Sequence, residues 1–129
     1  MLYKKYSIYI IVLSCLVFTS CGKLDGTFAF KKKIDHHYRK MQAQPQFHKN
    51  ESVQWVYVFK KFRGKHKIGV ILLKKEVVWI DVLSWHDTIN QRNKIIYGSI
   101  ENFEAGEYKI LLTEKDKMFA EQHFTIYDN

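Results

Sequence analysis

The sequence predicts an all-β domain, an antiparallel sandwich or barrel, after an N-terminal segment of different character. Three observations favour this fold class. From Ser52 onward, six short runs of apolar and β-branched residues recur at near-regular spacing, and the first alternates with a period of two. No convincing helical pattern separates these runs, so a parallel α/β sheet would lack its crossover helices.

The expected strands follow one another with polar turns between them. In the first strand, large apolar residues occupy alternate positions: Val53, Trp55, Tyr57 and Phe59. This period predicts a strand with at least one buried face. After a turn around Arg63-Gly64-Lys65, the other strands are expected at residues 68–73, 77–85, 95–103, 108–113 and 118–127.

A basic start and an apolar run occupy the N-terminus. The run at residues 8–18 follows Lys4 and Lys5, and it is shorter than the roughly 20 residues that cross a bilayer. It is typical of the core of a signal peptide, which we expect at residues 1–20. Of the two cysteines in the chain, Cys15 lies in this run and would leave with it.

The end of the run, "FTSC" at residues 18–21, resembles the lipobox of bacterial lipoproteins, with Phe18 where leucine is commoner. The resemblance implies that Cys21 becomes the acylated first residue of the mature chain and anchors it in a membrane, which needs two acyl chains. No thiol would then remain for a disulfide. Gly22, where some lipoproteins carry aspartate, implies sorting to an outer membrane. The alternatives are an ordinary signal peptide with an incidental cysteine and an uncleaved anchor.

Residues 21–50 predict a lipidated N-terminus followed by a basic tether. Polar and basic residues dominate this segment, and Pro45 lies among three glutamines. Ile34, Tyr38 and Met41 recur with a helical spacing, and a helix would end before the proline. We therefore expect a flexible or partly helical tether before the folded domain.

The last stretch of the domain expected at 51–129 carries a second resemblance. "FEAGEYKILLTEKDKMFAEQHFTI", residues 103–126, resembles the final hairpin of immunoglobulin-like and fibronectin-type sandwiches, with Gly106 and Tyr108 as its Gly-x-Tyr. The resemblance implies an antiparallel immunoglobulin-like β-sandwich. It also implies that Tyr108 forms a tyrosine corner, with a buried ring and a hydroxyl bonded to nearby backbone. It implies no activity, because such sandwiches host many functions.

No catalytic or metal-binding motif stands out, and we expect neither an enzyme nor a cofactor. The six histidines have no spacing that resembles a zinc motif; they are His36, His37, His48, His66, His86 and His123. Trp85-His86-Asp87, with Ser84 beside it, could be part of a catalytic constellation. Neighbours along a strand point to opposite faces, however, so this run cannot assemble a nucleophile, a base and an orienting group by itself.

Charge is unevenly distributed along the chain. Residues 21–75 carry 14 Lys and Arg against 3 acids, and residues 76–129 carry 5 against 10. The candidate binding patch consists of five basic residues, Lys60, Lys61, Arg63, Lys65 and Lys67. Beside a membrane, such a patch suits anionic lipid headgroups, acidic glycans or an acidic protein. The alternative is that these lysines only solvate a hairpin and protect a sheet edge from aggregation.

Together these patterns predict an exported bacterial lipoprotein, lipid-anchored in the cell envelope, that works as a binding or assembly module. Nucleic acid is not an expected partner, because an exported protein does not normally meet the genome. One alternative is a structural accessory subunit whose sheet edge docks onto a larger envelope complex. A histidine-based metal carrier ranks last.

Overall fold

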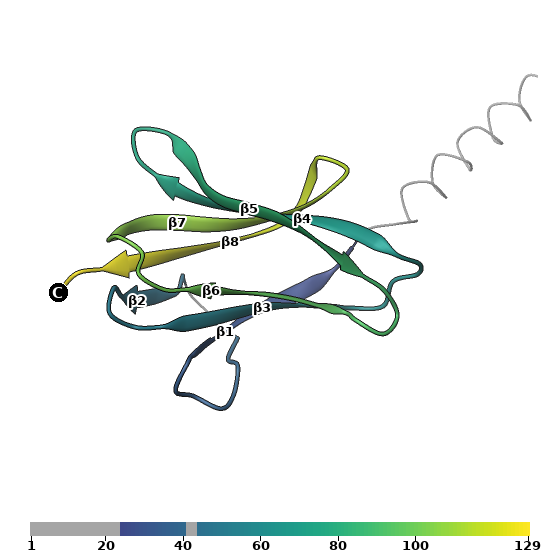
Figure 1. Cartoon of the computed structure of the whole chain (residues 1–129), viewed down its shortest axis with the longest axis horizontal. Coiled ribbons are helices and arrows are strands. Elements are labelled where there is room, and N and C mark those ends of the chain that lie inside the picture. The colour runs from purple at the N-terminus through teal and green to yellow at the C-terminus, as the bar shows by residue number, and fades with distance from the viewer. Residues whose placement is uncertain (1–23, 41–43) are drawn as a thin grey trace, which may run out of the picture.

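The computed structural model describes residues 24–40 and 44–129. Within these residues every helix or strand element is a β-strand, and the eight strands form two sheets packed face to face (Figure 1). The predicted all-β sandwich is therefore confirmed. The expected signal peptide and the acylated Cys21 lie outside the described residues.

The smaller sheet has three antiparallel strands. It contains β1 (Gly26–Lys32), β3 (Val53–Phe59) and β6 (Ile95–Ile100), with β3 in the middle. The alternation noted in the sequence directs Trp55, Tyr57 and Phe59 of β3 into the core, where each is at most 4% exposed. This sheet therefore supplies much of the aromatic side of the core.

The larger sheet has five strands in the order β2-β8-β7-β4-β5. These are β2 (Gln46–His48), β4 (His66–Lys75), β5 (Trp79–Ile89), β7 (Gly106–Glu114) and β8 (Lys117–Tyr127). All six strands expected after residue 52 are present, with shifted ends. Inward-facing residues such as Ile68, Ile110 and Phe124 are fully buried and complete the core.

When β2 and β5 are left out of the count, the remaining strands divide between the two sheets as in an immunoglobulin-like sandwich. In that fold the first, second and fifth strands share one sheet, and the third, sixth and seventh share the other. Here β1, β3 and β6 face β4, β7 and β8, and β5 and β2 extend the larger sheet at its two edges.

The sandwich is not wholly antiparallel, because β2 pairs with β8 in parallel. Residues 33–45 turn back along β1, where Phe30 and Arg39 form an antiparallel bridge. The chain then reverses once more, so β2 runs in the direction of β1. This is also the direction of β8, and the pairing is parallel for that reason.

The predicted tether is wrong for the described part of residues 21–50. These residues contribute β1 and β2, and Leu24, Phe30 and Phe47 are at most 4% exposed. The folded domain therefore begins by residue 24. The helix proposed around Ile34 and Tyr38 is not present in residues 24–40: Ile34 is 84% exposed in a turn region, and Met41 lies outside the described residues.

Tyr108 has the geometry of a tyrosine corner. Its ring is 2% exposed, and its hydroxyl donates a hydrogen bond of 2.7 Å to the backbone carbonyl of Glu104. The ring stacks on Phe124 at 5.3 Å and on Phe103 at 5.4 Å between centroids. Gly106, two residues before Tyr108, has φ 154°, a conformation that side-chain-bearing residues rarely adopt. Gly106 and Tyr108 together fix the β6–β7 connection onto the core.

Candidate functional site

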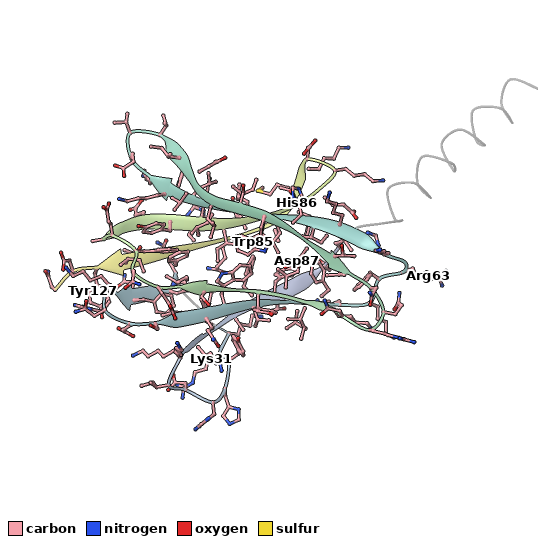
Figure 2. The ribbon with its side chains drawn as sticks, viewed as in Figure 1. Lys31, Arg63, Trp85, His86, Asp87 and Tyr127 are labelled. Carbon is pink, nitrogen blue, oxygen red and sulfur yellow. The ribbon has the colours of Figure 1, made fainter. Side chains whose placement is uncertain are left out.

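The five basic residues predicted as a patch lie in and just after the β3–β4 connection, at one end of the sandwich. In Figure 2, Arg63 marks this end and Tyr127 marks the opposite end. The chain enters the fold here as well, because the Lys60 amide donates a hydrogen bond of 2.8 Å to the carbonyl of Asp25. The predicted patch therefore sits beside the first described residues of the domain.

A second loop adds basic residues that the sequence interpretation missed. The β5–β6 connection packs against the β3–β4 connection, because the Phe59 amide bonds to the Lys94 carbonyl and the Gln91 side chain bonds to the Phe62 carbonyl. Arg92 and Lys94 thus join the patch from about thirty residues away in sequence. We call the resulting set the basic end: Lys60, Lys61, Arg63, Lys65, Lys67, Arg92 and Lys94.

Ion pairing differs between the two ends of the sandwich. In the described residues, no side chain of the basic end takes part in an ion pair. At the opposite end most lysines are paired: Lys32 with Glu51, Lys33 with Glu101, Lys49 with Asp128, Lys74 with Glu76 and Glu104, and Lys75 with Glu107. The basic end is therefore the part of the described surface where positive charge is least compensated.

His66 holds the β3–β4 connection in place. Its Nδ1 contacts the Glu114 carboxylate and its Nε2 lies 2.7 Å from the Arg63 carbonyl oxygen. Both partners are acceptors, so both ring nitrogens must donate, which is the imidazolium form. Burial lowers the pKa of His66, but the hydrogen bonds to Glu114 and Arg63 outweigh it, and the pKa is raised above its usual value. The charged form therefore fixes the backbone of the loop.

The edge-protection alternative is wrong for Lys67. That residue lies on β4, which is an interior strand between β7 and β5. The two edges of this sheet are β2 and β5, and β5 has 11 residues and contains no lysine and no proline. Natural edge strands usually carry such residues to prevent pairing with other chains. The protection that β5 does carry consists of two acidic residues, Asp81 and Asp87, and a β-bulge at Val82 opposite Leu72 and Leu73.

The apolar residues of β5 and its hairpin are unusually exposed. Val78 is 67% exposed, and Ile80, Val82 and Leu83 are each nearly half exposed. Val78 precedes β5, and the other three lie in the half of β5 that is far from the basic end, because Trp79 pairs with Lys75 while Ile89 pairs with His66. This exposed edge was not predicted as a site, since the order of strands in a sheet is not visible in a local pattern.

An open groove of about 340 Å³ adjoins this edge. Ile80 and Val82 line it on one side, and Phe103 and Tyr108 line it on the other. Lys74 closes one part through contacts of 3.1 Å to Glu76 and 3.0 Å to Glu104, and its hydrogen bond to Glu104 raises its pKa well above the usual value. The edge therefore combines free backbone groups with an apolar recess.

The residues with catalytic or metal-binding potential do not converge in the described part of the chain. In residues 24–40 and 44–129, no three His, Cys, Asp or Glu side chains lie close enough to hold a metal ion. Trp85 and Asp87 share one face of β5, where the Trp85 indole donates a hydrogen bond of 3.3 Å to the Asp87 carboxylate. His86 points to the other face. Among the same residues, no helix is long and apolar enough to cross a membrane.

Comparison with known proteins adds no further assignment. The chain matches no protein-family model and no curated protein. The functional conclusions therefore depend on the fold, the basic end and the β5 edge.

Proposed function

We propose that this protein is a lipid-anchored lipoprotein of the bacterial cell envelope, in the outer membrane, that works as an assembly module. Acylated Cys21 anchors the chain, and the immunoglobulin-like sandwich presents the exposed edge of β5 to a partner protein. The partner supplies an extended segment that pairs with β5 and adds a strand to the larger sheet. This mode of recognition is β-augmentation, in which main-chain hydrogen bonds give affinity and side-chain pockets give specificity.

The observation that carries the proposal is the exposed, apolar edge of β5, which no lysine or proline blocks. A long edge strand with exposed apolar residues pairs readily with another strand, and proteins normally block such edges. Val78, Ile80 and Val82 are exposed beside a groove that could receive alternate side chains of an added strand. An exposed edge of this kind is expected in a protein that pairs it with a strand of a partner.

The position of the edge supports the same function. The first described residue, Leu24, follows Cys21 closely in sequence and lies at the basic end. The exposed half of β5 lies toward the opposite end, where the β4–β5 hairpin projects from the sandwich (Figure 1). An anchor at one end and a pairing edge near the other would hold the edge clear of the membrane.

Site-specific photo-crosslinking in native membranes tests this proposal. A photoreactive residue replaces Val78 or Val82 in the full chain, and the matched control replaces Val58, which is 44% exposed on β3 in the other sheet. We expect protein adducts from positions 78 and 82 but not from 58. An adduct of twice the mass of the processed chain would identify a second copy as the partner.

A blocking variant makes the same experiment specific for strand pairing. Val82→Lys places a charge on the edge and should remove the adduct formed at position 78, whereas Val58→Lys should leave it intact. The proposal is wrong if positions 78 and 82 give no adduct, or if Val58 reacts as strongly as they do. If adducts do form, the fraction that contains the crosslinked partner distinguishes two roles. A partner that remains in the membrane fraction indicates an accessory subunit, and a partner found in the soluble fraction indicates a receptor for a soluble ligand.

A further inference from the structure

We propose that the basic end is a docking surface for the anionic phospholipid headgroups of the membrane in which the protein is anchored. The inference rests on the proposed anchoring through Cys21. It also defines the orientation of the domain: the β3–β4 and β5–β6 connections face the bilayer, and the opposite end of the sandwich points away from it.

The length of chain between the anchor and the fold supports this contact. Only residues 22 and 23 separate Cys21 from Leu24. Because an extended chain spans at most about 3.6 Å per residue, Leu24 lies within about 11 Å of the acylated residue. Asp25, the next residue, is bonded to Lys60 of the basic end. The loop is therefore held close to the membrane surface by covalent geometry.

Electrostatic attraction acts at the short end of the separations that the tether allows. Exposed charges farther apart than the Debye length, about 8 Å at physiological ionic strength, are largely screened from one another. Because about 11 Å is the fully extended limit, a less extended tether brings the loop within this range of the headgroups. The side chains of Lys61, Arg63 and Lys65 are exposed and extend the reach of the loop further. A basic segment next to an anionic leaflet is attracted to it for this reason.

The charges at this end are available for such a contact. Within the described residues no Lys or Arg of the basic end is paired with an acid, whereas lysines at the opposite end are paired. Four acidic residues lie near this end: Asp25, Asp87, Glu114 and Asp116. The carboxylate of Glu114 is engaged by His66. The seven Lys and Arg of the basic end still outnumber the three other acids.

Headgroups fit this surface better than an acidic protein or glycan does. A tether of about 11 Å leaves little room for a folded protein between the basic end and the bilayer. Such a partner would need the sandwich to tilt away from its own anchor. The exposed β5 edge, which lies toward the other end, has no such restriction.

The experiment uses the full chain, processed in cells, extracted in detergent and reconstituted into lipid nanodiscs. One set of discs contains phosphatidylcholine alone, and the other also contains phosphatidylglycerol. A spin label is attached to an introduced cysteine, in Asn93→Cys at the basic end or in Ala105→Cys at the opposite end. Its accessibility to lipid-soluble and water-soluble relaxation agents reports its distance from the bilayer.

We expect the label at position 93 to lie nearer the bilayer in the anionic discs, and the label at 105 to be insensitive to lipid charge. Changing Lys61, Arg63 and Lys65 to Gln should move the label at position 93 away from the bilayer in the anionic discs. Each substitution should lower the ratio of docked to undocked protein by about fivefold, and the three together should lower it by about a hundredfold. The control changes Lys32, Lys49 and Lys75 to Gln, which removes the same charge at the opposite end and should have little effect.

The possible failures can be told apart. If the protein does not remain with either kind of disc, the anchoring is wrong and the docking inference falls with it. If it remains with the discs but the label at 93 responds neither to phosphatidylglycerol nor to the triple substitution, the docking inference alone is overturned. It is also overturned if the control substitution has an equal effect, or if a soluble acidic polysaccharide binds the basic end while lipid charge does not matter.

Discussion

The tyrosine corner at Tyr108 joins the sequence to stability most directly. Tyr108→Phe keeps the buried ring and removes one hydrogen bond, the 2.7 Å contact to the Glu104 carbonyl. A hydrogen bond of this kind contributes about 0.5 to 1.5 kcal/mol net. Because Glu104 is an exposed residue, water can replace the lost donor. We expect a loss near the lower half of that range.

Tyr108→Ala should be far more damaging. The ring is 2% exposed and stacks between Phe103 and Phe124, so its removal leaves a cavity in the core. Truncation of a buried aromatic residue costs about 3 to 5 kcal/mol, which is a large share of the stability of a small domain. The change would also enlarge the groove beside β5, since Tyr108 lines it.

Chemical denaturation of the two variants measures these losses. Tyr97 offers a matched control, because it lies on β6 and is 70% exposed. Tyr97→Phe and Tyr97→Ala should each change the free energy of unfolding by less than about 0.5 kcal/mol. The assignment of the corner is refuted if Tyr108→Ala is as stable as the unchanged protein.

Three further predictions concern the fold and the basic end. The raised pKa of His66 contributes stability that is fully present below its unfolded pKa and is lost as the pH rises through the folded pKa. His66→Gln should remove this loss of stability as the pH rises above about 6.5, and equal slopes in both proteins would disprove it. A chain that begins at residue 51 lacks β1 and β2. Compared with a chain that begins at residue 22, it should lose both cooperative unfolding and a strand-dominated circular dichroism spectrum. Equal stability of the two chains would mean that residues 24–50 do not belong to the domain. Gly98→Val places a side chain against the Trp55 indole, whose Nε1 lies 2.6 Å from the ideal Cβ position at residue 98. The substitution should destabilise the protein by about 1 to 3 kcal/mol. An unchanged denaturation midpoint would contradict this packing.

Local patterns predicted much of the sandwich. The alternation of large apolar residues from Val53 to Phe59 indicated β3, and the Gly106-x-Tyr108 sequence indicated the turn that leads into β7 and the buried ring within it. These features are visible in the sequence because each depends on residues that are neighbours along the chain.

The features that were missed depend on contacts between distant residues. The apolar pattern of β1 consists of little more than Phe28 and Phe30 before three lysines, and it becomes a strand because it pairs with β3. Arg92 and Lys94 join the basic end only because the β5–β6 connection packs on the β3–β4 connection. In the same way, the exposure of β5 follows from the strand order and not from its own sequence.

The most direct test of the central proposal is the fate of Cys21. Cells producing the full chain are labelled with a fatty-acid analogue and then fractionated, and the unchanged protein is compared with Cys21→Ser. If the chain is anchored through an acylated Cys21, the unchanged protein takes up label and remains with the membranes until detergent is added, while the variant takes up none and leaves that fraction. Label that persists in Cys21→Ser would contradict anchoring through this residue, and with it the orientation of the sandwich on its basic end.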